Sequence, residues 1–284
     1  MSRTQIETAT RDNLVAPFYE YYDFLARLHI PASDIKHPPA EEGWPNTTAE
    51  NCSGLGKSDF VVDVLRHLPY IADHGEFERN ISNTDFKSNV VDYSTATPED
   101  FSGPSLKHGE ISHEAEGPVS RHKVVVACGY ESGGIDLILD TRTGEIFEEI
   151  IRIGSGETLP VREYFELKMR QCRELKTVFA PGENAHWGGF GDKEGPYDAA
   201  AMEEAGEPSY PDEGFHLEGQ EWDLKWVCHL YRKFGWPGEG WRKEEGLKAI
   251  AEYVERRNAE AERRHEEVER RKREAERRNA EANL

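Results

Sequence analysis

The segment Lys123–Ile153, KVVVACGYESGGIDLILDTRTGEIFEEIIRI, decides the fold of this chain. It contains three apolar runs, and the middle run alternates apolar residues with Asp136 and Asp140. Such alternation is typical of a β-strand with one polar face. Glycine-containing turns separate the runs, and Gly144 supplies the positive φ that a tight hairpin requires. The segment therefore predicts a three-stranded antiparallel meander.

Helical periodicity surrounds this meander on both sides. Pro17 in a first turn, Ser58 or Asp59 as a cap, and Thr158 as a cap mark three helix starts. The predicted helices cover 17–30, 58–68, about 160–175, 220–234 and a final segment from near Trp241 almost to the end. The sequence thus predicts an α+β fold, in which an antiparallel meander sheet packs with helices and a long charged C-terminal helix follows.

The final helix contains a strict repeat of seven residues, with Glu-Arg-Arg beginning at 255, 262, 269 and 276. A period of seven is typical of a coiled coil. The seam of that coil would offer only Val254 and Val268 as residues worth burying. Glu–Arg pairs four residues apart favour instead a single solvated helix, with a weak dimeric coil as the alternative. We therefore expect a monomer or weak dimer, and expect deletion of 256–284 to leave the stability of the rest nearly unchanged.

These patterns divide the chain into an acidic α+β domain over 1–240 and a charged, solvent-exposed helix over 241–284. The acidic domain contains a Gly- and Pro-rich acidic loop over 181–219 and a tryptophan-rich helix over 220–234. A loop of that length is either functional or a flexible lid.

The charge is unevenly distributed. The chain of 284 residues has a formal charge of −20, and its last part, 252–284, is neutral because ten Glu face ten Arg or Lys. The charge before residue 252 disfavours nucleic acid and anionic membranes and favours a protein partner with a basic surface, although solubility alone would also explain it. Four widely spaced cysteines, no signal peptide and no membrane span predict a cytoplasmic, intracellular protein.

No strong catalytic motif is present. The string GLGKS at 54–58 lacks the earlier glycine and the strand of a phosphate-binding loop, so it predicts a helix-capping loop. The cluster His108, Glu110, His113 and Glu114 contains residue types that bind metals, but the spacing of its histidines does not suit a helical zinc site. We expect neither a metal nor a cofactor. A hydrolase that uses this cluster together with the 182–219 loop is the alternative to a binding protein.

Several residues are candidates for partner binding. Trp44 lies in a proline-rich crossing, and Trp187 lies in HWGGFG, where glycines would let a ligand approach the backbone. The segment 194–221 holds nine acidic residues without Lys or Arg. The candidates are Trp44, Asp136, Asp140, Trp187, Glu203, Glu204 and Glu207.

One combination of features resembles a known superfamily. Gly43-Trp44-Pro45 follows the first helix, GGIDLILDTRTGEIFEEI covers 133–150, and Tyr164-Phe165 stand on the next predicted helix. Over about 17–175 this arrangement resembles the SUKH superfamily, which includes fungal cell-wall-synthesis regulators and bacterial immunity proteins. The style of the sequence is also similar to that of fungal proteins. The resemblance implies an α+β domain that binds proteins and performs no chemistry, so a non-catalytic, regulatory or immunity-like function is expected.

Overall fold

The computed structural model describes residues 10–72, 74, 82–102, 120–181, 186–187, 198–207 and 221–282. The chain forms two compact units, one of residues 1–179 and 183–187 and the other of residues 180–182 and 188–284. This division differs from the expected boundary at 240/241, because the tryptophan-rich helix and the C-terminal helix belong to the same unit. The predicted α+β class, with a long C-terminal helix, is confirmed.

The first unit contains a six-stranded sheet whose strands follow one another in chain order and pair antiparallel. The strands are β3 (Asn83–Asp85), β4 (Ser88–Val90), β5 (Lys123–Gly129), β6 (Ile135–Asp140), β7 (Glu145–Ile150) and β8 (Gly154–Pro160). The predicted meander β5–β6–β7 is confirmed, and the sheet is wider than predicted on both sides. β8 was missed because GSGETLP has no apolar alternation, and Thr158 lies in this strand rather than capping the next helix.

Strand β6 is the centre of the sheet. Its six residues pair one to one with β7, and all six are buried, so both faces of the sheet are covered at this strand. Glu148 of β7, which is paired with Leu137, contacts residues of α5 (Val161–Arg173). The face of β6 with Ile135, Leu137 and Leu139 is therefore the one that α5 covers.

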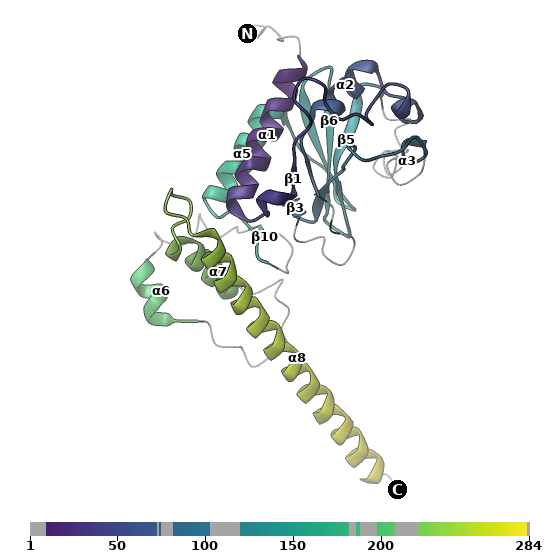
Figure 1. Cartoon of the computed structure of the whole chain (residues 1–284). Coiled ribbons are helices and arrows are strands. Elements are labelled where there is room, and N and C mark those ends of the chain that lie inside the picture. Colours follow the sequence, from purple (N-terminus) through teal and green to yellow (C-terminus); the bar gives the residue numbers. More distant parts are fainter. Residues whose placement is uncertain are drawn as a thin grey trace, which may run out of the picture. The chain divides into compact units, whose positions relative to one another are not determined.

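Helix α1 (Arg11–Leu28) begins six residues before the predicted start at 17, because Thr10 is its cap and accepts a hydrogen bond from the Asn13 N–H. Pro17 lies inside the helix rather than in its first turn. α1 and α5 lie side by side along one side of the sheet, with α3 (Pro98–Ser102) on the other side (Figure 1). The Phe165 ring of α5 lies 4.7 Å from the rings of both Phe18 and Tyr21, which joins the two helices through aromatic contacts.

Short elements complete the first unit. Ser58 caps α2 (Asp59–His67) as predicted, since its hydroxyl oxygen accepts a hydrogen bond from the Val61 N–H. The remaining elements are η1 (Ala32–Asp34), β1 (Ile35–Lys36), η2 (Asn51–Leu55), α2 (Asp59–His67), β2 (Tyr70–Ile71), β9 (Thr177–Val178) and β10 (His186–Trp187). β1 pairs with β2 and β9 pairs with β10, in both cases antiparallel.

The described helices of the second unit are α6 (Ala199–Ala205), α7 (Glu221–Lys233) and α8 (Lys243–Ala282). Gly235, with a φ of 102°, follows the end of α7, as the sequence predicted. The contact between α7 and α8 buries an apolar core formed by Trp226, Val227, Leu230, Tyr231, Ile250, Tyr253 and Val254. The boundary at 241 had implied that α8 is solvated from its start. The first part of α8 is instead packed against α7.

The buried part of α8 ends at Arg257, which is 4% exposed. Beyond Arg257, none of the described side chains of α8 is buried. The premise of the expected deletion of 256–284, that its residues bury little, does not hold at Arg257, and the solvated part of the helix begins after this residue.

Candidate functional site

The face of β6 and β7 that points away from α5 carries two pairs of like charges. Asp136 stands directly opposite Glu149, and Asp140 stands directly opposite Glu145. Phe147 lies between the two glutamates on β7 and opposite Ile138. We call the set Asp136, Asp140, Glu145, Phe147 and Glu149 the carboxylate face. Like charges directly opposite each other on neighbouring strands are destabilising, so this arrangement needs an explanation.

The two aspartates of the carboxylate face are bound by the backbone. Asp136 Oδ1 accepts a hydrogen bond of 2.7 Å from the Gly129 N–H. Asp140 Oδ1 accepts a hydrogen bond of 2.9 Å from the Arg142 N–H, which fixes the turn into β7. Each aspartate is 5% exposed. The structure therefore places these two candidates beneath the surface, where they hold turns and add negative charge.

The glutamates of this face are more accessible. Glu145, Phe147 and Glu149 are half-buried. Glu149 accepts a hydrogen bond of 3.4 Å from the Ser155 hydroxyl, and Glu145 forms no ion pair with any residue that the structure describes. Lys123 contributes a cation, with its Nζ 4.3 Å from the centre of the Phe147 ring. The carboxylate face thus combines an aromatic centre with an excess of negative charge.

A buried charged network lies on the opposite side of β7. Lys168 Nζ lies 2.7 Å from Asp85 Oδ2 and 2.7 Å from Glu148 Oε1. The Tyr164 hydroxyl donates a hydrogen bond of 2.8 Å to Glu148 Oε1, and the Glu157 N–H donates one of 3.0 Å to Glu148 Oε2. Burial alone would lower the pKa of Lys168, but the two carboxylates outweigh it and raise this pKa above its ordinary value. The network fastens β3, β7 and β8 to α5.

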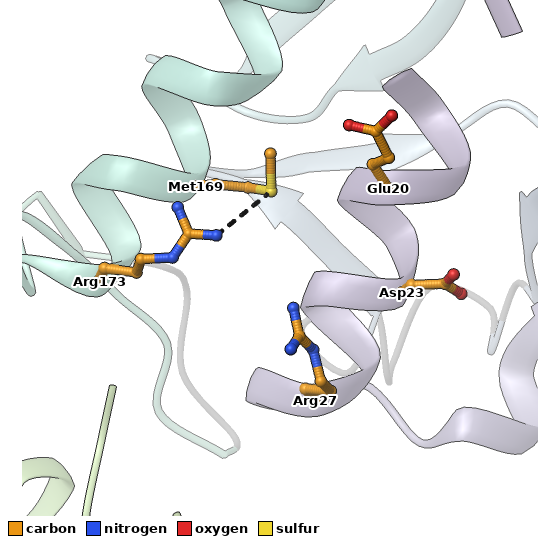
Figure 2. Close-up of a pocket in the computed structure, with 5 residues that line it drawn as sticks. All are labelled: Glu20, Asp23, Arg27, Met169 and Arg173. Atoms are coloured by element: carbon orange, nitrogen blue, oxygen red, sulfur yellow. Dashed lines mark hydrogen bonds between the residues drawn. The ribbon is translucent and has the colours of Figure 1, made fainter. Parts of the chain in front are cut away.

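A shallow groove of about 670 Å³ lies between α1 and α5. Its lining residues are Glu20, Asp23 and Arg27 of α1 and Met169 and Arg173 of α5 (Figure 2). The Arg173 guanidinium lies toward Met169, with a nitrogen–sulfur distance of 3.9 Å (Figure 2). Two acidic and two basic side chains give the groove no net charge, so it does not select a partner of one sign. Sequence reasoning missed it because the two helices meet only in the folded chain.

The lining residues of the groove already have contacts within the first unit. Glu20 accepts hydrogen bonds from Arg162, with nitrogen–oxygen distances of 3.0 and 3.1 Å. The guanidinium carbons of Arg173 and Arg27 lie 5.0 and 6.0 Å from the centre of the Phe24 ring. These exposed charges therefore serve the packing of α1 on α5, with cation–π contacts as one component.

The two candidate tryptophans lie outside strands β6 and β7, which carry the carboxylate face. The Trp44 indole N–H donates a hydrogen bond of 2.8 Å to the Leu68 carbonyl oxygen, and its ring centre lies 5.9 Å from that of Tyr70. Trp44 is half-buried and ties the proline-rich crossing to the end of α2. Trp187 pairs with Thr177 in the β10–β9 ladder. Its side chain lies outside the described part of the structure.

Two acidic candidates of the second unit contact basic side chains of the same unit. Glu203 lies 2.8 Å from Lys233 and 3.1 Å from His229, and Glu207 lies 2.6 Å from Arg256. The hydrogen bonds from Lys233 and His229 lower the pKa of Glu203. Glu204 is exposed and forms no ion pair within the described residues. Two of the three candidates are therefore engaged in holding α6 and the residues that follow it.

The structure describes only some of the residues on which the remaining sequence predictions rest. The cluster His108–Glu114 and most of the 182–219 loop lie outside the described residues. Among the residues that are described, no group of His, Cys, Asp and Glu is arranged to hold a metal ion. The GLGKS string ends in the Ser58 cap of α2, so the predicted helix-capping loop is confirmed. None of the described helices has both the length and the apolar composition required to cross a membrane.

Comparisons of this chain with protein-family models, with curated proteins and with solved structures give no match.

Proposed function

We propose that this chain is a non-catalytic, SUKH-like protein-interaction protein that binds a partner with a basic surface. The observation that carries the proposal is the carboxylate face, where Glu145 and Glu149 stand directly opposite two buried aspartates. Like-charge pairs of this kind destabilise the free protein, although Lys123 of β5, which stands directly opposite Asp140, offsets part of the repulsion there. A cationic surface that docks here relieves this repulsion, so the arrangement favours a basic partner.

Two further observations support the proposal. The formal charge of −20 attracts cationic surfaces over a longer range and raises the rate of encounter with them. The resemblance to the SUKH superfamily implies the same class of function, because it implies an α+β domain that binds proteins. The proposal includes a cytoplasmic location, which the four free cysteines support because disulfides are rare in that compartment.

The test combines a pull-down from native extract with binding kinetics of the purified partner at several salt concentrations. We expect the association rate to fall steeply with salt, because exposed charges are screened within about 8 Å at physiological ionic strength. The double variant Glu145→Gln/Glu149→Gln should lower the association rate more than it raises the dissociation rate.

The matched control is Glu203→Gln/Glu207→Gln, which removes the same number of charges from residues already paired with Lys233 and Arg256. From the sequence alone, Glu203, Glu204 and Glu207 were candidates for partner binding, and the internal ion pairs of Glu203 and Glu207 shift that expectation to the carboxylate face. A partner whose association rate is indifferent to salt and to the carboxylate-face variant would contradict the proposal.

A further inference from the structure

Strand β8 is the accessible edge of the six-stranded sheet. It ends the sheet on one side, and no other strand in the described part of the chain pairs with its outer edge. β3, at the opposite edge, has three residues and all are buried, whereas β8 has seven residues, of which 155–158 are exposed. An edge strand presents unpaired backbone N–H and C=O groups, which are a template for another strand.

An exposed apolar residue adjoins this edge. Ile153 precedes β8 directly and is 73% exposed. Its neighbour Arg152 has a φ of 68°, a left-handed conformation that is uncommon for arginine and belongs to the tight turn between β7 and β8. Natural edge strands are usually protected by charges or proline, and here Pro160 protects only the far end of the strand. Between Ile153 and Pro160 the only charged residue of the strand is Glu157, whose negative charge protects the edge against an acidic strand but not against a basic one.

The strand is anchored from beneath by Glu148. Its ladder with β7 is interrupted between Phe147 and Glu149, where the Glu157 N–H turns inward to the buried carboxylate of Glu148. Gly156 lies against the same side chain, since a Cβ at this position would stand 2.7 Å from Glu148 Oε2. A pre-organised edge loses little conformational entropy when it binds, which favours association.

We propose that β8 receives an extended segment of a basic partner by strand addition, with an apolar side chain of that segment packed on Ile153. This inference rests on the proposed function and names the surface that performs it. An added strand would lie about 4.8 Å beyond β8. From there, long Lys or Arg side chains extend over Ser155 and Thr158 toward Glu149 of the carboxylate face. Backbone pairing supplies affinity, and the alternating side chains supply specificity.

Charge selects this occupant over a second copy of the same chain. An antiparallel pair of β8 strands would bring together two copies of Glu157, which is exposed, and two chains of formal charge −20. Such juxtaposition of like charge disfavours the pair. A basic segment has the opposite sign and meets the same backbone groups.

The experiment selects binders from a displayed library of random peptides of about ten residues, the upper length of common strands, with the full chain as bait. The expected binders alternate apolar and basic residues. The affinity of a selected peptide is then measured by fluorescence anisotropy, for the parent and for two versions that are N-methylated at alternate residues. One version should bind at least about tenfold more weakly, because it loses the backbone hydrogen bonds to β8, and the other should bind like the parent.

Two protein variants locate the binding. Ile153→Ser should weaken binding by about tenfold through the loss of apolar contact. Val268→Ser is the matched control, because Val268 is also an exposed aliphatic residue, at 48%, and lies in α8. It should leave the affinity unchanged.

The outcomes separate this inference from the proposed function. Basic peptides that bind equally well in all methylated forms would overturn strand addition and leave the basic partner standing. Selected peptides without basic residues would overturn the proposed function. A wild-type dimer in sedimentation that Ile153→Ser dissolves would identify a second copy as the occupant and overturn the inference. The strand-addition inference is also overturned if the wild-type bait retains no more peptide than the Ile153→Ser bait.

Discussion

Asp223 and Arg257 are 34 residues apart in the sequence, and Arg257 Nε lies 2.7 Å from Asp223 Oδ1 in the contact between α7 and α8. Both side chains are buried, and Asp223 also accepts a hydrogen bond from the Tyr253 hydroxyl. A buried ion pair of this kind is costly to break from one side, because the remaining charge keeps its burial and loses its partner. This pair therefore determines how far α8 can be shortened.

We expect deletion of 256–284 to destabilise the second unit by roughly 3–5 kcal/mol, because it leaves Asp223 buried without its cation. Deletion of 265–284 should change stability by less than about 0.5 kcal/mol, because none of the described side chains that it removes is buried. Thermal unfolding followed by circular dichroism measures both. Arg257→Met should reproduce the loss and Arg263→Met should not. Equal melting temperatures for the two deletions would refute the structural role of Arg257.

Lys168→Met should destabilise the first unit by roughly 3–5 kcal/mol, because Asp85 and Glu148 would remain buried without a cation. Chemical denaturation measures the loss. Lys176→Met is the control, since Lys176 forms its ion pair with Glu174 at the surface, and its effect should stay below about 1 kcal/mol. Adding Asp85→Asn and Glu148→Gln to Lys168→Met should restore part of the stability. A triple variant less stable than Lys168→Met would contradict this account.

Gly156→Ala should destabilise the first unit by roughly 1–3 kcal/mol, because the new methyl group would press on Glu148, whose Cβ lies 3.0 Å from the position it takes. The neighbouring variant Ser155→Ala, at an exposed site of the same strand, is the control and should lose less than about 0.5 kcal/mol. Denaturant titration of both variants makes the comparison. A neutral Gly156→Ala would show that Glu148 can move without loss to the network.

The folded protein should resist alkali until its buried tyrosines ionise. Burial raises the pKa of Tyr21, Tyr22, Tyr70 and Tyr164 above the ordinary value for tyrosine. Because the folded-state pKa is the higher one, their contribution to stability is complete below the unfolded pKa of about 10 and is lost as pH rises beyond it. Tyrosinate absorbance and circular dichroism, followed together, measure this. Ionisation of these four residues before any loss of secondary structure would contradict their burial.

The sequence predicted the elements whose patterns repeat locally. It missed the elements that depend on contacts with residues far along the chain. The alternation in β6 and the turn at Gly144 sufficed for the meander, because strand pairing across a tight turn is local. β8 escaped notice because Gly156 is explained by its contact with Glu148 and Gly154 by its φ of 111°, and no periodicity reveals either. The start of α1 was missed because Pro17 is also favoured in a first turn, and only burial of Leu14 and Val15 extends the helix before it.

Part of the candidate site could be predicted from the sequence. Asp136 and Asp140 were chosen for their spacing on one strand, and they lie on the face that carries the proposed function. Glu145 and Glu149 were not chosen, although the same alternation, continued through the turn, places them opposite those aspartates. The choice of Glu203 and Glu207 overlooked His229, Lys233 and Arg256, because charge counted along a segment does not include basic side chains from other helices.

The exposed end of α8 has a defined length and a defined direction. A helix rises about 1.5 Å per residue, so residue 279 stands about 33 Å from Arg257. Each residue also turns the helix by about 100°, so the stretch fixes a direction as well as a length. One inserted residue would rotate the end of the helix by about 100° about the helix axis, so its side chains would face another side. Seven inserted residues, one unit of the Glu-Arg-Arg repeat, would lengthen the helix by about 10 Å and return its end to within about 20° of the original bearing.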